Sequence, residues 1–259
     1  MLERELESVP AGERPIAVVA SAGTASTGAI DALDELADVC GAHGVWLHVD
    51  AAYGGAAVLT DRYRAALAGL ARADSVALDP HKWLYVPVDC GCALVRRGDE
   101  LRDVFSLIPP YLRQTGDEQV GTFAEYGFEQ TRPFRALRVW AALAATGRDG
   151  YRRLIDNDLD HAERLAERVH DHPELELESV RLSIVCFRYR SDGANDALQA
   201  EIARRIQLSG EAFVTTTAVN GRTALRACFL NPLTSAADVD ALVELVARAG
   251  DELRSARRG

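Results

Sequence analysis

Short apolar runs alternate with segments of helical spacing through the first part of the chain. Continuous apolar runs of about four to eight residues, bounded by turn residues, are typical of buried strands in a parallel sheet. Between them, apolar residues recur three and four positions apart, which is the spacing of an amphipathic helix. We therefore expect strands over residues 16–21, 45–49, 75–78 and 92–96, and helices over residues 30–40 and 62–72.

The order of these elements predicts the topology. Alternating strands and helices with right-handed crossovers form a mainly parallel sheet with flanking helices, an α/β fold. The strand at residues 92–96 is expected to pair with its predecessor as a hairpin. Ser26 or Thr27 is available as N-cap of the first helix, and Gly41 or Gly44 as its stop. In such a sheet, ligands bind beyond the carboxyl ends of the strands.

The pattern changes in the second half of the chain. Residues 105–132 have no clear period, and a stretch of this kind is often a functional lid or binding loop. Ser235 and Asp238 form a capping-box signature for the last helix. The remaining elements indicate a small α+β domain. We expect a helix over residues 134–145 before this domain. Within the domain we expect helices over residues 151–170, 195–207 and 236–254, and strands over residues 175–180, 183–189, 212–218 and 223–229.

The composition is that of a soluble globular protein. The chain has 259 residues, of which 48% are hydrophobic and 26% charged, and these values exclude disordered and fibrous classes. No apolar run reaches the roughly 18 residues that a membrane-spanning helix needs, and the first residues lack the apolar region of a secretory signal. We therefore expect a cytoplasmic protein. A net charge of −10 without a basic tract argues against nucleic acid and membranes as partners and favours a small molecule.

The cysteines and histidines predict no metal site. Five cysteines form no CxxC pair, and we expect them to be reduced. Cys90 and Cys92 lie two positions apart in a predicted strand, so we expect both on one face as small apolar side chains. The histidines outside the motifs described below sit in polar contexts without zinc-ligand spacing, which favours surface roles.

Lys82 is the only lysine among the 29 basic residues of the chain. For solvation and surface ion pairs, arginine replaces lysine well. Arginine cannot lose its proton and attack a carbonyl carbon, whereas a lysine amine can. A lone lysine therefore indicates Schiff-base or general-base chemistry, although a biased composition could also leave its last lysine anywhere by chance.

The neighbourhood of Lys82 decides between these interpretations. Asp50 ends one predicted strand and Lys82 follows the end of another, so both belong to the same edge of the sheet. Pyridoxal phosphate needs a lysine for its aldehyde and a carboxylate that keeps its pyridine nitrogen protonated. Ala51 and Ala52 leave room for a flat ring, and His81 could donate to the phosphate. Alone, Asp50 would be read as a solvated acid; beside the only lysine, it indicates a pyridoxal phosphate site.

Three motifs resemble one known family. They are GTASTGAID at residues 23–31, HVDAAYGG at residues 48–55 and DSVALDPHKW at residues 74–83. This combination resembles the group II pyridoxal-phosphate-dependent amino-acid decarboxylases of fold type I, which include aromatic-amino-acid, glutamate and diaminobutyrate decarboxylases. Weaker matches at residues 110–112, 134–140 and 185–188 extend the resemblance over nearly the whole chain.

The resemblance implies specific roles around the cofactor. Lys82 would be the Schiff-base lysine, and Asp50 the partner of the pyridine nitrogen. Ala52 would contact the face of the ring. His81 and Asp79 would lie near the phosphate.

Two further positions follow from the resemblance. Tyr111 corresponds to the tyrosine of a mobile catalytic loop that would deliver a proton to Cα after CO2 leaves. Ala25 stands where many relatives carry a second threonine, which leaves Thr24 and Thr27 as candidates for a hydroxyl contact with the cofactor. Arg132, Arg135 and Arg138 are expected to make a substrate or structural contact, or to form a basic helix face.

The resemblance also implies a division of the chain. Residues 1–104 would be the C-terminal part of the cofactor-binding large domain, residues 105–150 the catalytic loop and connecting helix, and residues 151–259 the small domain. Because family members are considerably longer, we expect an N-terminal portion to be lacking. The partner would then be a missing N-terminal half or a second copy in a homodimer.

Three functions follow as hypotheses. The first is decarboxylation of an L-amino acid to the amine and CO2 through Lys82. The second is a catalytically silent remnant, or one half of a split enzyme. The third is another fold-type-I lyase or transaminase, against which Tyr111 and the DPHKW context favour decarboxylation. The sequence does not choose among aromatic, acidic and diamino substrates.

Overall fold

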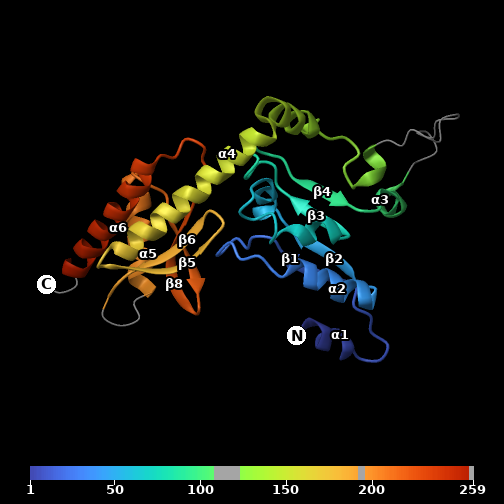
Figure 1. Ribbon diagram of the computed structural model, residues 1–259, viewed down its shortest axis with the longest axis horizontal. Helices are drawn as coiled ribbons and strands as arrows, with labels where there is room; N and C mark the ends of the chain where they lie inside the picture. Colours follow the sequence, from blue (N-terminus) through green and yellow to red (C-terminus); the bar gives the residue numbers. More distant parts are fainter. Residues whose placement is uncertain (108–122, 192–195, 257–259) are drawn as a thin grey trace.

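A four-stranded sheet forms the first part of the molecule, as expected. The computed structural model describes residues 1–107, 123–191 and 196–256 (Figure 1). The strand order is β1-β2-β3-β4, with β1, β2 and β3 parallel and β4 antiparallel to β3, which confirms the predicted hairpin. The strands are β1 (Ala17–Ser21), β2 (Trp46–Asp50), β3 (Ser75–Leu78) and β4 (Cys92–Val95).

Helical segments precede, connect and follow these strands. They are α1 (Leu2–Glu7), α2 (Leu33–His43), η1 (Gly54–Leu59), η2 (Ala68–Arg72), α3 (Gly98–Phe105) and η4 (Phe123–Tyr126). The helix α2 follows β1, and both η1 and η2 lie between β2 and β3. Beneath them, the core contains fully buried side chains such as Leu47, Val49 and Trp83.

The helix predicted over residues 30–40, which is α2, begins later than expected. Neither Ser26 nor Thr27 is its N-cap; α2 starts at Leu33, and Ala32 precedes it. The reason is that Ile30 forms a β-bridge with Ala22, so the chain stays extended for several residues beyond the turn. At the other end, Gly44 adopts φ 63° as the helix stop, as expected.

The predicted helix over residues 62–72 is wrong. This segment consists of turns followed by the 3-10 helix η2. Gly69 packs against the first turn of α2, where an added β-carbon would lie 2.6 Å from the backbone nitrogen of Asp34. The apolar spacing correctly predicted that Leu67 is buried. Where Gly69 approaches α2 closely, however, the chain forms short turns and a 3-10 helix instead of a regular α-helix.

A second sheet, entirely antiparallel, has the order β5-β6-β8-β7. Three helices pack with it (Figure 1). In the described parts of the chain, no helix is both long and apolar enough to cross a membrane. The elements are α4 (Arg135–Asp171), β5 (Leu175–Arg181), β6 (Ile184–Tyr189), α5 (Asp196–Ser209), β7 (Thr215–Val219), β8 (Arg222–Cys228) and α6 (Ala236–Ala256).

The two helices predicted over residues 134–145 and 151–170 are present as the two arms of α4, which is kinked at the non-helical Gly147 with φ 66°. The strand predicted from residue 212 begins only at Thr215, where its pairing with β8 starts. The carbonyl of the preceding residue, Val214, accepts a hydrogen bond from the side chain of Gln207 instead. The capping box is confirmed, since Asp238 accepts from the backbone and hydroxyl of Ser235.

Both faces of β6 are buried. Ile184 and Cys186 belong to the apolar cluster of the first sheet, whereas Val185 and Phe187 belong to the cluster under α4, α5 and α6. Alternate residues of a strand point to opposite faces, so the second sheet lies between its own helices and the first part of the molecule. The predicted boundaries at residues 104 and 150 stay predictions, and α4 continues across the second of them.

The turn between β5 and β6 joins the two parts. Leu182, at φ 51°, and Ser183 form its tip. The hydroxyl of Tyr53 accepts from the backbone nitrogen of Ser183 at 3.0 Å and lies 2.8 Å from its hydroxyl oxygen. Tyr63 accepts from the nitrogen of Leu182 at 3.0 Å. Gly54 also faces this turn, since an added β-carbon would lie 2.7 Å from Leu182 Cδ1.

Tyr53→Phe is expected to lower the free energy of unfolding by about 1–3 kcal/mol, because it leaves two buried polar groups of Ser183 without this partner. Urea denaturation measures the loss. Tyr63→Phe removes one acceptor only and should cost less. Equal stability of Tyr53→Phe and the unsubstituted chain would contradict this account of the junction.

All five cysteines are free thiols. The expectation that Cys90 and Cys92 share one strand face is wrong, because β4 begins at Cys92. Cys90 lies in the preceding loop, where its backbone contacts the ring of His81. His81 belongs to the turn that follows β3, at the carboxyl edge of the first sheet.

Candidate active site

Asp50 is the last residue of β2, the inner strand between β1 and β3. It pairs in register with Ser21 on one side and Ala77 on the other. Its side chain is exposed, and its Oδ1 accepts a hydrogen bond from the backbone nitrogen of Ala52 at 3.1 Å. The carboxylate is thus held at the carboxyl edge of the parallel strands by the turn that follows it.

Lys82 lies in the turn that follows β3. Its backbone nitrogen donates to the carbonyl of Asp79 at 2.9 Å, and its Nζ lies 2.9 Å from Asp79 Oδ2. The lysine side chain is 37% exposed, so the amine is accessible while paired. The short turn therefore presents one amine and one carboxylate together.

Ala52 connects the two motifs. Its nitrogen donates to Asp50, and its carbonyl accepts from the nitrogen of Asp79 at 3.2 Å. A continuous chain of hydrogen bonds and one ion pair runs from Asp50 through Ala52 and Asp79 to Lys82. The structure thus brings together the residues that the sequence placed at neighbouring strand ends.

His81 is held by the loop before β4. Its Nδ1 lies 2.6 Å from the carbonyl oxygen of Cys90 and 3.2 Å from the nitrogen of the same residue. One ring nitrogen cannot donate to the first and accept from the second in the same tautomer, and the shorter contact favours a proton on Nδ1. The other nitrogen, Nε2, lies 4.0 Å from Asp79 Oδ2. Only the imidazolium form would then donate from Nε2 to a phosphate.

Thr24 is engaged within its own turn. Its hydroxyl oxygen accepts from the nitrogen of Ala29 at 3.1 Å and lies 3.2 Å from the hydroxyl oxygen of Thr27. A hydroxyl in this position can still donate one hydrogen bond. Its contact with a cofactor stays a prediction. The predicted catalytic Tyr111 lies outside the described residues.

The three arginines near the start of α4 make structural contacts. Arg135 pairs with Asp89 and Glu129. Arg138 lies 3.7 Å from a carboxylate oxygen of Asp89. The pairs with Asp89 tie the start of α4 to the loop before β4.

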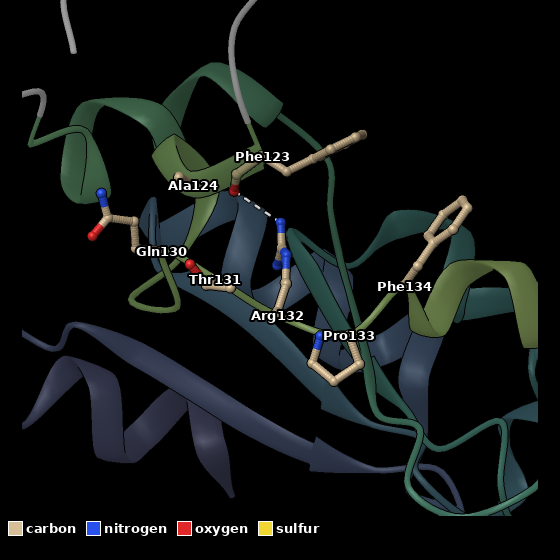
Figure 2. Close-up of a pocket in the computed structure, with 7 residues that line it drawn as sticks. All are labelled: Phe123, Ala124, Gln130, Thr131, Arg132, Pro133 and Phe134. Carbon is tan, nitrogen blue, oxygen red and sulfur yellow. Dashed lines mark hydrogen bonds between the residues drawn. The ribbon is translucent and has the colours of Figure 1, made fainter.

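Arg132 contributes to a separate surface hollow. It donates to the carbonyl of Phe123 at 2.8 Å, and its guanidinium lies 5.7 Å from the centroid of the Phe123 ring. Figure 2 shows these two residues and the others that line the hollow, which include none of the predicted site residues. The hollow therefore gives no support to a substrate contact at Arg132.

The sequence did not predict the buried aromatic residues that pack next to Lys82. Trp83, fully buried, stacks on Tyr53 with ring centroids 5.1 Å apart and an interplanar angle of 11°. Its Nε1 donates to the buried carboxylate of Asp158 at 2.8 Å. A signal was present, because Asp158 falls between Ile155 and Leu159 on the apolar face of a predicted amphipathic helix, where an unpaired charge is costly.

Comparisons with known proteins identify the family of the chain. Residues 1–190 match the model of the pyridoxal-dependent decarboxylase conserved domain. An aromatic-L-amino-acid decarboxylase from Bacillus atrophaeus is 37% identical over 86% of this chain and 48% of its own length. An L-2,4-diaminobutyrate decarboxylase from Rhizobium meliloti is 35% identical over 94% of this chain and 50% of its own length. The chain thus spans about half the length of the curated relatives that it matches.

Solved structures are similar over nearly the whole chain. A TDC from Oryza sativa, solved with PLP and tryptamine, has a TM-score of 0.91 and 30% identity, and the match covers 97% of this chain and 54% of that one. A tryptophan decarboxylase from Catharanthus roseus, solved with L-tryptophan, has a TM-score of 0.87 and 30% identity, covering 97% and 53%. The expected fold class, a fold-type-I α/β portion followed by a small α+β portion, is confirmed.

Proposed function

Because the chain belongs to the pyridoxal-dependent decarboxylase family, we propose that it supplies the lysine-bearing part of an amino-acid decarboxylase. The reaction would remove the α-carboxyl group of an L-amino acid and release the amine and CO2. The observation that carries this proposal is the hydrogen-bonded chain that joins Asp50 to Lys82, the only lysine.

The groups at the edge of the sheet fit pyridoxal phosphate chemically. An accessible amine, Lys82, suits the aldehyde; an exposed carboxylate, Asp50, suits the pyridine nitrogen. Between them, Ala51 and Ala52 present only small side chains. When bound, the cofactor supplies the electron sink that takes up the electron pair of the broken carbon–carbon bond.

Each side chain of the site would have a distinct task. Asp79 holds the amine of Lys82 in place through their ion pair. Asp50 would stabilise a positive charge at the pyridine nitrogen, because an opposite charge within hydrogen-bond distance favours the protonated ring. Ala52 would contact the face of the ring. His81, through Nε2, would contact the phosphate, and Thr24 would offer its hydroxyl to the cofactor.

The substrate class follows from the relatives only in broad terms. They include decarboxylases of aromatic amino acids and of L-2,4-diaminobutyrate. We propose to test L-tryptophan, L-tyrosine, L-glutamate and L-2,4-diaminobutyrate with pyridoxal phosphate and to measure both CO2 and amine. Release of both in equal amounts supports decarboxylation, whereas transfer of the amino group to a keto acid without CO2 would favour a transaminase.

We also propose that a further polypeptide covers an apolar stripe on α4. The stripe consists of Phe134, which precedes the first residue of α4, and of Leu137, Trp140 and Leu143 on the helix itself; Phe134 is 73% and Trp140 is 68% exposed. Val19 on the edge strand β1 is 67% exposed as well. Apolar surface of this kind marks an interaction site, and about half of each relative's length lies outside the match. The proposed occupant is therefore a polypeptide equivalent to that unmatched half.

Co-expression tests this occupant. The unmatched half of the Bacillus atrophaeus relative is expected to form a one-to-one complex with the chain. A homodimer that forms in its absence and excludes it would contradict the proposal.

Trp140→Glu is expected to weaken that complex at least tenfold, because a carboxylate on the stripe would have to be desolvated at the interface. Analytical ultracentrifugation measures the dissociation constant. Leu233→Glu is the matched control, since Leu233 is exposed in the loop before α6 and not on the stripe. Equal weakening by both substitutions would show that the stripe has no special role.

A further inference from the structure

A buried carboxylate on α4 contacts the segment that follows Lys82. Asp158 has no exposed surface. Its Oδ2 accepts one hydrogen bond from Trp83 Nε1 at 2.8 Å and another from the hydroxyl of Tyr85 at 2.6 Å. Two residues within three positions of the lysine are thus attached to a single oxygen atom of a distant helix.

The same helix makes a second attachment to this segment. The hydroxyl of Tyr151, about two turns before Asp158 on α4, donates to the carbonyl of Leu84 at 2.9 Å. Tyr85 adopts φ 52°, a left-handed conformation that a bulky side chain adopts only when its surroundings enforce it. Residues 83, 84 and 85 are therefore each held by a side chain of α4.

We propose that Asp158 is a positioning residue for Lys82, whose amine it keeps in place by fixing Trp83 and Tyr85. The inference rests on the proposed function, because it assigns a purpose to the position of that amine. The backbone carries the effect, since the nitrogen of Tyr85 donates to the carbonyl of Lys82 at 3.1 Å and the nitrogen of Val86 to that of Pro80 at 3.1 Å. Releasing Tyr85 would loosen the turn that holds Lys82 beside Asp79.

The environment of Asp158 agrees with this role. Within the described residues, its Oδ1 is buried and has no hydrogen-bond partner. Burial raises the pKa of the Asp158 carboxyl, and the bonds from Tyr85 and Trp83 oppose that rise. A buried carboxyl group that keeps one oxygen unpaired is costly, so packing alone would be served better by an apolar residue of the same size.

The test compares three substitutions with a matched control. Asp158→Asn keeps an acceptor oxygen of the same reach, Asp158→Leu removes it at similar volume, and Tyr85→Phe removes one donor only. Asp160→Asn is the control, because Asp160 lies on the same helix, is exposed and pairs with Arg62 instead. Circular dichroism and thermal unfolding establish which variants are folded.

Two readouts report on Lys82 itself. The first is acylation of the amine without cofactor, followed by peptide mass spectrometry; Lys82 is the only lysine, so the signal is separated from that of the N-terminal amine. The second is the dissociation constant for pyridoxal phosphate from the visible absorbance of the lysine adduct. The first readout remains informative if the chain binds no cofactor, which separates failure of this inference from failure of the proposed function.

We expect Asp158→Leu to change the acylation rate of Lys82 about threefold or more and to weaken adduct formation about tenfold, with Tyr85→Phe intermediate. Asp158→Asn and Asp160→Asn should stay within twofold of the unsubstituted chain. If folded Asp158→Leu leaves the acylation rate unchanged, the inference is wrong. If Asp158→Leu does not fold, Tyr85→Phe decides in the same way, and an unchanged rate again overturns the inference.

Discussion

Lys82→Arg is expected to abolish the visible absorbance band that the chain forms with pyridoxal phosphate. Arginine preserves the positive charge and can still pair with Asp79, whose Oδ2 lies 2.9 Å from Lys82 Nζ. It cannot supply the neutral amine that attacks an aldehyde. The substitution therefore removes the covalent chemistry while it keeps the electrostatics of the turn. Absorbance titration with the cofactor measures the effect.

A displaced lysine provides the control for this prediction. Arg97→Lys, introduced into the Lys82→Arg chain, restores a lysine at an exposed position after β4. It should not restore the band, because position and not merely the presence of an amine is required. A band of undiminished strength in Lys82→Arg would contradict the assignment of the amine.

Asp50→Asn is expected to lower the rate of amino-acid decarboxylation about 100-fold, which is the effect of removing one preorganised electrostatic group from an active site. Asparagine keeps the size of the side chain and an oxygen that can accept from Ala52. It loses the negative charge that would keep the pyridine nitrogen protonated. The measurement is the rate of CO2 release in the preparation with the proposed partner, together with the titrated affinity for pyridoxal phosphate.

Asp61→Asn is the matched control for that substitution, because Asp61 is an exposed carboxylate that pairs with Arg64, three positions along the chain. Its rate should equal that of the unsubstituted chain. A decrease of less than threefold for Asp50→Asn would show that Asp50 does not serve the ring nitrogen.

The sequence correctly predicted that Asp50 and Lys82 lie at the same edge of the sheet, because both motifs are local. Asp50 and Lys82 each follow a short apolar strand, and parallel strands align their carboxyl ends at one edge of a sheet. The contact between the two motifs then follows from topology. What the pattern could not predict was Ala52 as the bridge between Asp50 and Asp79, because it depends on backbone hydrogen bonds in the turn.

The errors arose where long-range contacts override local preference. Residues 62–72 have helical spacing, yet Gly69 packs against the first turn of α2, and the segment forms turns and η2. The start of α2 is delayed by the bridge between Ala22 and Ile30. Neither contact leaves a periodic signal in the sequence.

The supports of the lysine turn are long-range as well. Trp83 and Tyr85 meet Asp158 across more than seventy positions of sequence, so no spacing rule links them. The sequence indicated this contact only through Asp158, an acidic residue on the apolar face of a predicted helix. Such a residue needs a buried partner, but the sequence does not say which one.

The most direct test of the central claim is reductive trapping of the native chain with pyridoxal phosphate and borohydride, followed by peptide mapping. Borohydride makes the lysine adduct permanent, and the denatured chain serves as the reference for nonspecific labelling. We predict one pyridoxyl group on the peptide that contains Lys82 in the native chain, at a cofactor concentration that leaves the denatured chain unlabelled. Labelling confined to the N-terminal amine, or equal labelling of native and denatured chain, would contradict the claim that this fold presents Lys82 to the cofactor.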